Sequence, residues 1–156
     1  MTTFPSLPSG LWFDEFEPGQ TMVTAGRTVT EADVVNFAGL SGDFSAVHMD
    51  AQYSAQSGYG QRVAHGLLVV AIVSGLLVQT GLLDGTLGAF REIKSWKFKH
   101  PAAIGDTIRA EINVLETNPL KGIDAGLVAI SIRVLNQDDL ALMTGRWSIM
   151  VMSRPA

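Results

Sequence analysis

The stretch Gly66-Leu67-Leu68-Val69-Val70-Ala71-Ile72-Val73-Ser74-Gly75-Leu76-Leu77-Val78 decides how the rest of this chain can fold. No charged residue occurs between Gly66 and Leu83. The strongly apolar part is only roughly twelve residues long, which favours a buried core helix over a membrane span. Because the residues on every side of this predicted helix are apolar, we expect it to be enclosed by the protein. It should begin at Gly66 and end near Thr80 or Gly81.

A shorter helix is predicted before it, over residues 30–41. Thr30-Glu31-Ala32-Asp33 has the pattern of a capping box, in which Thr30 accepts from free backbone amides and Asp33 reaches back. Apolar residues follow at helical spacing, and Gly42 is a typical helix end. We therefore expect a helix that delivers the chain directly to Asp43.

The segment between the two helices is predicted to be mostly irregular. Residues 43–48 are expected to form a loop, and residues 51–57 one or two helical turns that Asp50 caps. Two glycines make residues 58–62 a flexible connector.

Strands are predicted on both sides of the helices. Residues 20–29 are rich in Thr and Val, and Ile108, Ala110, Ile112 and Val114 alternate as one buried face of a later strand. Asn136 to Asp139 supplies a hairpin turn. The strands expected after the long helix cover residues 86–99, 107–117, 127–135 and 141–152.

One enclosed helix and an antiparallel sheet predict an α+β fold. The sheet would curl around the helix, in the hot-dog arrangement, so that the helix needs no second layer. The open edge of such a sheet would be covered by pairing with a second subunit. We expect residues 1–156 to form one domain, with residues 1–18 as an aromatic lead-in packed on its edge.

The composition excludes several classes of protein. With 47% hydrophobic and 17% charged residues the chain is globular, and its low charge indicates a surface buried against another subunit. The net charge of −4 argues against nucleic acid as a partner. There are no cysteines, so disulfides and thiolate chemistry are excluded. The first ten residues lack the basic and apolar parts of a signal peptide, so a cytoplasmic location is expected.

Asp43 and His48 are the first candidates for chemistry. If the four residues between them form a turn, a carboxylate and an imidazole can face one cleft and activate water. We expect burial to raise the pKa of Asp43 towards neutrality. The alternative is that Asp43 caps the turn and His48 is an ordinary hydrogen-bonded loop residue.

His65-Gly66 and Ser74 are the second group of candidates. A glycine in the first turn of a helix lets a ligand approach a backbone amide that has no helical partner, which suits a developing oxyanion. The alternative is that Gly66 simply allows close packing of helix on sheet. The Ser74 hydroxyl needs a partner inside an apolar helix, either a backbone carbonyl or a polar group in a cleft.

Other uses of these residues are less well supported by the sequence. His48, His65 and His100 fall in different predicted elements without cysteines, so no metal site is expected. No serine-nucleophile elbow or phosphate-binding glycine loop occurs, and no cofactor is expected. The basic residues Arg91, Lys94, Lys97 and Lys99 form a solvated strand face or receive the phosphates of a nucleotide-tailed substrate.

Taken together, these residues resemble the MaoC-like hydratase family, whose best-known members are R-specific enoyl-CoA hydratases. The resemblance runs from about residue 23 to residue 150. The family's hallmark is a Gly-Asp-x-Asn-Pro-x-His-x-Asp segment ahead of a His-Gly helix start. The matching positions here are Gly42, Asp43, His48, Asp50, Ala64, His65 and Gly66.

The resemblance implies a hot-dog homodimer that hydrates trans-2-enoyl thioesters, linked to CoA or to acyl carrier protein, or catalyses the reverse dehydration. It implies that Asp43 and His48 activate water and handle the proton at the α-carbon, and that the Gly66 amide holds the thioester oxygen. Ser74 would orient the acid. Apart from the resemblance, His65, Lys97 and Lys99 are candidates for substrate binding.

One position departs from the family pattern. The usual Asn-Pro is Ser45-Ala46 in this chain, so the rigid proline is missing while Ser45 can still form a turn hydrogen bond.

Two other functions compete with the hydratase. A hot-dog thioesterase would need a carboxylate on or near the central helix, and residues 67–83 contain none. A non-catalytic, acyl-thioester-binding subunit of a larger dehydratase would become active only with a partner chain.

Overall fold

The computed structural model describes residues 10–155, which form a curved sheet wrapped around one long helix. The sheet has the strand order β1-β4-β5-β6-β3, and β2 pairs with the first two residues of β4. All of the pairings are antiparallel. The strands are β1 (Thr21–Val23), β2 (Arg27–Thr28), β3 (Leu87–Phe98), β4 (Thr107–Pro119), β5 (Ala125–Leu135) and β6 (Ala141–Met152).

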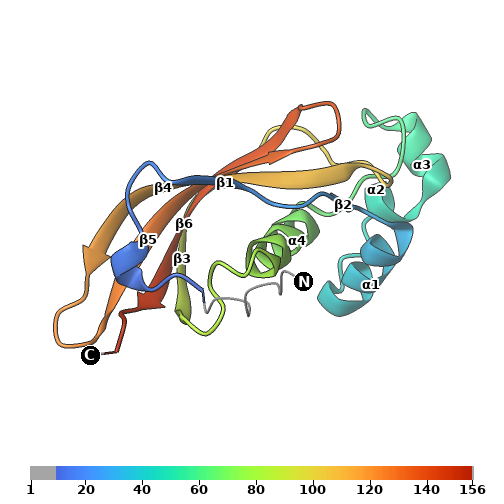
Figure 1. Cartoon of the computed structure of the whole chain (residues 1–156). Coiled ribbons are helices and arrows are strands. Elements are labelled where there is room, and N and C mark those ends of the chain that lie inside the picture. Colours follow the sequence, from blue (N-terminus) through green and yellow to red (C-terminus); the bar gives the residue numbers. More distant parts are fainter. Residues whose placement is uncertain (1–9, 156) are drawn as a thin grey trace, which may run out of the picture.

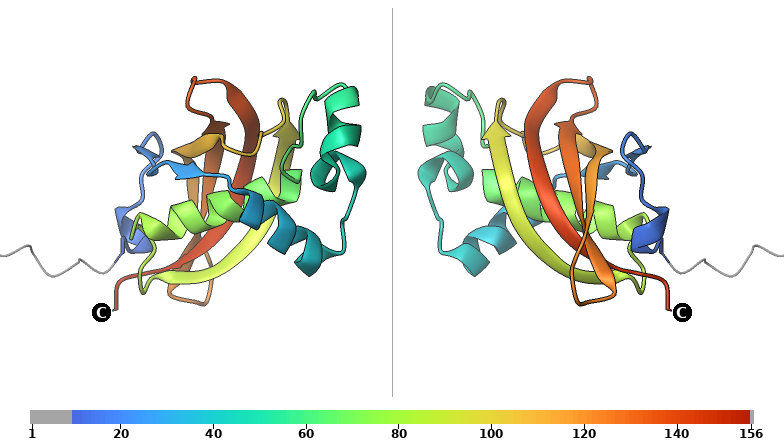
Figure 2. Two further views of the ribbon diagram at one scale, coloured as in Figure 1. Left: turned by 90° about the vertical axis from the view of Figure 1, so that its right-hand side faces the viewer. Right: turned by 90° about the vertical axis from the view of Figure 1, so that its left-hand side faces the viewer.

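The long helix α4 (Gly66–Gln79) lies across the concave face of the sheet, as expected of a hot-dog fold (Figures 1 and 2). Three shorter helices, α1 (Glu31–Ser41), α2 (Ala46–Met49) and α3 (Ala51–Gln56), gather beyond its N-terminal end (Figure 2). Within residues 10–155, no helix is long and apolar enough to cross a membrane.

The core lies between α4 and the inner face of the sheet. Ile72, Val73 and Leu76 of α4 are buried there, and Trp147 of β6 is the largest side chain among the fully buried ones. The alternating residues predicted for β4 are buried as expected. Burial of this apolar area stabilises the wrapped sheet at about 25 cal/mol for each Å² removed from water.

The helix α4 is not enclosed on every side, so that expectation was wrong. Leu67 is 66% exposed and Val78 is 50% exposed, and Ala71 and Gly75 lie on the same open stripe. The sheet covers only the opposite side of the helix. A single chain therefore leaves the apolar residues of this stripe exposed to solvent.

The helix α1 begins and ends as predicted. The Thr30 hydroxyl accepts from the Asp33 amide, the Asp33 carboxylate accepts from the Thr30 amide, and Gly42 closes the helix in the left-handed conformation at φ 79°. Asp50 caps α3 by accepting from the amides of Gln52 and Tyr53.

Two local expectations need correction. Residues 20–29 form two short strands instead of one, because the Thr24 hydroxyl accepts from the Ala110 amide and the ladder is interrupted between β1 and β2. Residues 43–48 are not all loop: α2 forms because the Ser45 carbonyl accepts from the amides of His48 and Met49.

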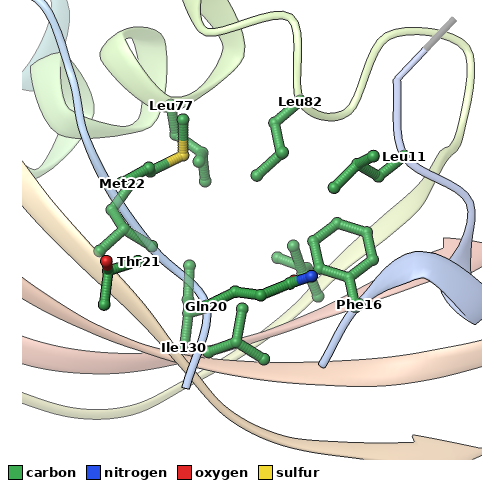
Figure 3. Close-up of a pocket in the computed structure, with 11 residues that line it drawn as sticks. Leu11, Phe16, Gln20, Thr21, Met22, Leu77, Leu82 and Ile130 are labelled. Atoms are coloured by element: carbon green, nitrogen blue, oxygen red, sulfur yellow. The ribbon is translucent and has the colours of Figure 1, made fainter. Parts of the chain in front are cut away.

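The lead-in is described from Gly10 onwards, and the first nine residues lie outside the described part. A short 3₁₀ helix, η1 (Phe13–Glu15), places the Phe13 ring against Gly126, where a Cβ would meet the ring at 2.1 Å. Leu11 and Phe16 close an apolar cavity of about 210 Å³ at the C-terminal end of α4, together with Leu77 and Leu82 (Figure 3).

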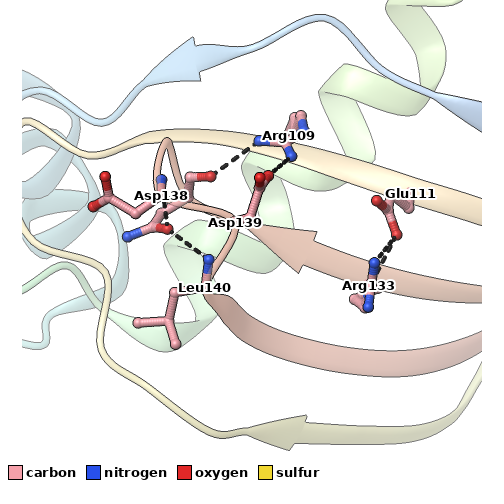
Figure 4. A network of polar contacts seen from close by, with 7 residues as sticks. Arg109, Glu111, Arg133, Asp138, Asp139 and Leu140 are labelled. Atoms are coloured by element: carbon pink, nitrogen blue, oxygen red, sulfur yellow. Dashed lines mark hydrogen bonds and ion pairs between the residues drawn. The ribbon is translucent and has the colours of Figure 1, made fainter.

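The predicted hairpin turn at Asn136 to Asp139 is present between β5 and β6. The Asn136 side-chain oxygen accepts from the amides of Asp138 and Leu140, and Asp139 adopts a positive φ of 62°. Arg109 donates to the Asn136 carbonyl and pairs with Asp139 (Figure 4). Such short polar side chains tolerate the left-handed conformation because they bond to the local backbone.

Candidate active site

A cleft of about 640 Å³ opens at the N-terminal end of α4. His48 of α2 and Gly66 of α4 line it from the helical side, and Phe98, Lys99 and His100 line it from the end of β3. Its other lining residues are Tyr59, Val63, Ala64, Leu67, Pro101, Ala102 and Met143.

The tautomer of His48 follows from its backbone contact. Its Nδ1 lies 2.8 Å from the Val63 carbonyl oxygen, which can only accept, so Nδ1 carries the proton. In the neutral imidazole, the other ring nitrogen, Nε2, therefore carries the lone pair. A neutral imidazole held in this way can accept a proton from water.

Asp43 follows the left-handed Gly42 and reaches the same region from the end of α1. One of its carboxylate oxygens and one ring nitrogen each of His48 and His65 lie within 4.8 Å of one another. Asp43 does not line the cleft itself but stands beside it. The structure therefore brings together the acid and the imidazole that the sequence singled out.

The expected environment of Asp43 was wrong. The carboxyl is exposed, and the hydrogen bonds from the Ser45 hydroxyl and then the Ser45 amide lower its pKa below the usual value. Slight burial opposes this effect, and His65 and His48 add to it. Asp43 is thus held as a carboxylate, and not as an acid close to neutrality.

His65 is buried behind His48 and does not reach the cleft, contrary to a role in substrate contact. Its ring, 2% exposed, lies against the His48 ring at a centroid distance of 3.8 Å and contacts Phe37. His65 Nε2 donates to the Asp43 backbone carbonyl at 2.9 Å. His65 therefore ties the Asp43 backbone to the start of α4.

The side chains of Asp43, His48 and His65 lie close enough together for a metal site. No metal site was expected from the sequence. The two imidazole planes are tilted by only 32° and lie one over the other. Because ring lone pairs lie in the ring plane, two such rings point along nearly parallel lines and not at one ion. One nitrogen of each ring is also bonded to a backbone carbonyl. This geometry favours proton transfer over metal binding.

Gly66 lies at the cleft and packs closely against the sheet. It is the first residue of α4 and lines the cleft, so its amide belongs to the unpaired set of a helix start. A Cβ at this position would meet the Phe98 ring at 2.7 Å. The absence of a side chain therefore permits both the packing of Phe98 and a close approach to the backbone.

The structure separates two other candidates from the cleft. Ser74 is half-buried about 12 Å further along α4 and does not line the cleft. Lys97 lies in a different surface depression, with Arg133 and Arg146, whereas Lys99 lines the cleft.

Tyr59 and Met143 are cleft residues that the sequence reasoning missed. Tyr59 is an exposed aromatic residue between Gly58 and Gly60, a pattern that could have marked it as a surface contact. Met143 of β6 carries no comparable signal, because its position opposite Phe98 depends on strand register.

Comparisons with known proteins identify the family of this chain. The family model described as MaoC like domain matches residues 15–134. The chain is 36% identical over 110 residues to an (R)-specific enoyl-CoA hydratase of Rhodospirillum rubrum, covering 70% of this chain and 74% of that protein. It is 39% identical over 105 residues to Protein MaoC of Klebsiella aerogenes, covering 67% of this chain but 31% of that protein. The chain thus spans about a third of the Klebsiella protein.

A solved structure shows the same architecture. The unliganded R-hydratase of Pseudomonas aeruginosa superposes with a TM-score of 0.78 at 31% identity, covering 93% of this chain and 88% of that chain. The match to the family model extends over the Asp43 and His65 regions. The chain belongs to the MaoC-like family of hydratases and dehydratases.

Proposed function

We propose that this protein hydrates trans-2-enoyl thioesters, most simply CoA-linked ones, to R-3-hydroxyacyl thioesters, or catalyses the reverse dehydration. The observation that carries this proposal is the convergence of Asp43, His48 and the Gly66 amide at one end of α4. The names of relatives such as the Rhodospirillum rubrum hydratase support the same reaction.

The two side chains divide the proton transfers between them. A water held near the Asp43 carboxylate and His48 Nε2 loses a proton to this pair while its oxygen bonds to C3 of the enoyl group. The electrons of the double bond move toward the thioester and form an enolate. The pair then returns a proton to C2, so that one water is added in total.

The Gly66 amide would hold the thioester oxygen during this addition. Its position in the first turn of α4 places an unpaired N–H and the positive end of the helix dipole at the cleft. A donor of this kind stabilises the enolate oxygen more than the neutral carbonyl, which is what accelerates the reaction. Lys99 supplies a cation at the cleft for the phosphates of a carrier.

We also infer a homodimer, because one chain leaves two apolar surfaces open. One is the α4 stripe around Leu67 and Val78. The other is the inner side of the edge strand β3, where Phe90, Ile93 and Phe98 are exposed. An edge strand of 12 residues with apolar side chains is suited to pairing with a second copy.

Hydration of crotonyl-CoA by purified variants tests the proposal. Asp43→Asn and His48→Ala should each lower kcat/KM by about 10²-fold or more, the usual scale for loss of an acid–base group. Asp50→Asn is the matched control, because Asn caps helices as well as Asp and Asp50 serves α3. Circular dichroism should show an unchanged fold in all three.

Undiminished hydration in either site variant would contradict the proposal. If the wild-type chain binds acyl-CoA but hydrates it only after addition of a partner chain, the non-catalytic subunit is the better description. Release of free thiol from acyl-CoA would instead indicate a thioesterase.

A further inference from the structure

Ser45 makes an unusual use of its hydroxyl. Its Oγ donates to Asp43 Oδ1 at 2.5 Å, and its backbone amide donates to the same oxygen at 3.2 Å. Within residues 10–155, the second carboxylate oxygen, Oδ2, has no hydrogen-bond partner. The carboxylate is therefore held through one oxygen and presents the other.

Ser45 also stands at the start of the helix that carries His48. It is the N-cap of α2, and its carbonyl accepts from the His48 amide at 2.9 Å. A serine at an N-cap ordinarily accepts a backbone amide with its side chain. Here that capping bond is not made, and the hydroxyl turns back to Asp43 instead. The Ser45 amide and the Asp43 carboxylate form the local bond of an Asx-turn, and the Ser45 hydroxyl adds a second bond to the same oxygen in place of an N-cap bond.

We propose that Ser45 is a positioning residue that fixes the Asp43 carboxylate with Oδ1 occupied and Oδ2 free to face the reacting water. Because Asp43 is catalytic only if the chain hydrates enoyl thioesters, this role rests on the function proposed above. Ser45 stands where the MaoC-like family pattern has Asn. The following residue, Ala46, occupies the first position of α2, where a helix also tolerates proline. This chain therefore holds its acid with a hydroxyl from a segment without the proline.

The charge state of Asp43 provides a readout that a purely structural role would not change. The Ser45 hydroxyl stabilises the ionised carboxylate and lowers its pKa, and the imidazoles of His65 and His48 are the titratable groups that act on it as well. Removing the hydroxyl should move the pKa of Asp43 upward, towards its ordinary value. Since the base must be ionised for hydration, the acid limb of the kcat/KM profile should then move to higher pH.

Three variants test this inference. In Ser45→Ala we expect kcat to fall several-fold with KM unchanged, and the acid limb to rise by about half a pH unit or more. Ser45→Thr keeps a hydroxyl, so its kcat and the position of its acid limb should be those of the wild type. Ser41→Ala is the matched control, because the Ser41 hydroxyl contacts the Asp43 amide at 3.2 Å and not its carboxylate. It should leave the acid limb in place.

Titration of the Asp43 carboxyl carbon by NMR gives the same answer without turnover. An equal titration midpoint in the wild type and Ser45→Ala, or an equal shift in Ser41→Ala, would overturn the role of Ser45. A raised midpoint in Ser45→Ala with no change of kcat or of the acid limb would overturn it too, because the contact would then not serve catalysis. If the wild type hydrates no enoyl thioester, the proposed function fails, while the NMR midpoints still decide whether Ser45 holds the carboxylate.

Discussion

The two ends of α4 are built in opposite ways. At its N-terminal end an open cleft of about 640 Å³ is bordered by Gly66, His48 and Lys99. At its C-terminal end a partly open cavity of about 210 Å³ is lined mainly by apolar side chains such as Leu77 and Phe16 (Figure 3). By helix geometry, Gly66 and Leu77 are about 16 Å apart along the axis.

This difference separates reactivity from stability. The polar end depends on a few directed contacts, such as the exposed bond of Ser45 to Asp43 and the partly buried bond of His65 to the Asp43 carbonyl. Each is a single hydrogen bond, whose net contribution to folding is modest. The apolar end removes large side chains from water and binds the lead-in to the helix. Substitutions at one end should therefore alter turnover, and substitutions at the other should alter the free energy of unfolding.

The largest expected effect is at the apolar end. Leu77 is 4% exposed and lines the cavity, so Leu77→Ala both loses buried area and enlarges an existing void. We expect a loss of about 3 kcal/mol or more in the free energy of unfolding, measured with urea. With crotonyl-CoA, whose acyl group is short, kcat/KM of the folded variant should stay close to that of the wild type. A large loss of turnover would show that the two ends are coupled.

Gly66→Ala should have the next largest effect, at the polar end. The added methyl group would meet the Phe98 ring at 2.7 Å and crowd the approach to the helix amide. We expect kcat/KM to fall by about 10²-fold, the scale for loss of one oxyanion donor. The double variant Gly66→Ala with Phe98→Ala removes the clash and serves as the control. If it regains full activity, Gly66 serves packing alone and not the approach of substrate to the amide.

Thr30→Ala should have a smaller effect, on the support of the polar end. Thr30 and Asp33 cap α1, the helix that ends at Gly42 just before Asp43. We expect a loss of about 1 kcal/mol in the free energy of unfolding at pH 7, measured with urea. The variant should keep most of its activity, because the contact of Ser45 with Asp43 is local to residues 43–45.

The pH dependence of this loss has a defined sign. Burial raises the pKa of Asp33, but the hydrogen bonds from the Thr30 amide and hydroxyl and the contact with Arg27 outweigh it, so the pKa is lowered. A lowered pKa gives stability that is present above the ordinary Asp value of about 3.9 and is lost as the pH falls through the folded value. The difference between Thr30→Ala and the wild type should therefore shrink below about pH 4. A difference that is constant down to pH 2 would contradict this account of the cap.

The sequence predicted the fold and the proximity of Asp43 to His48 better than the electrostatics of these two side chains. The apolar run at residues 66–79, the Gly42 helix end and the Asn136 turn are local signals, and the structure confirms them. The open stripe on α4 could not be predicted, because a pattern that is apolar on all sides does not say which chain covers each side. The burial of His65 and the exposure of Asp43 depend on how three short helices pack, which no periodicity reports.

The smallest expected effect tests whether the apolar cavity has room to spare. Val114 of β4 lines it, so Val114→Ile adds one methylene without losing the branched side chain that suits a strand. We expect about 0.5–1 kcal/mol of added stability in urea unfolding, because the new group fills a partly open void and packs against the apolar side chains that line it. Val128→Ile is the control, since Val128 is fully buried in β5 and does not line the cavity, so the same methylene should overpack and destabilise. If both variants lose stability, the C-terminal end of α4 is as tightly filled as the rest of the core, and the contrast between the two ends lies in polarity alone.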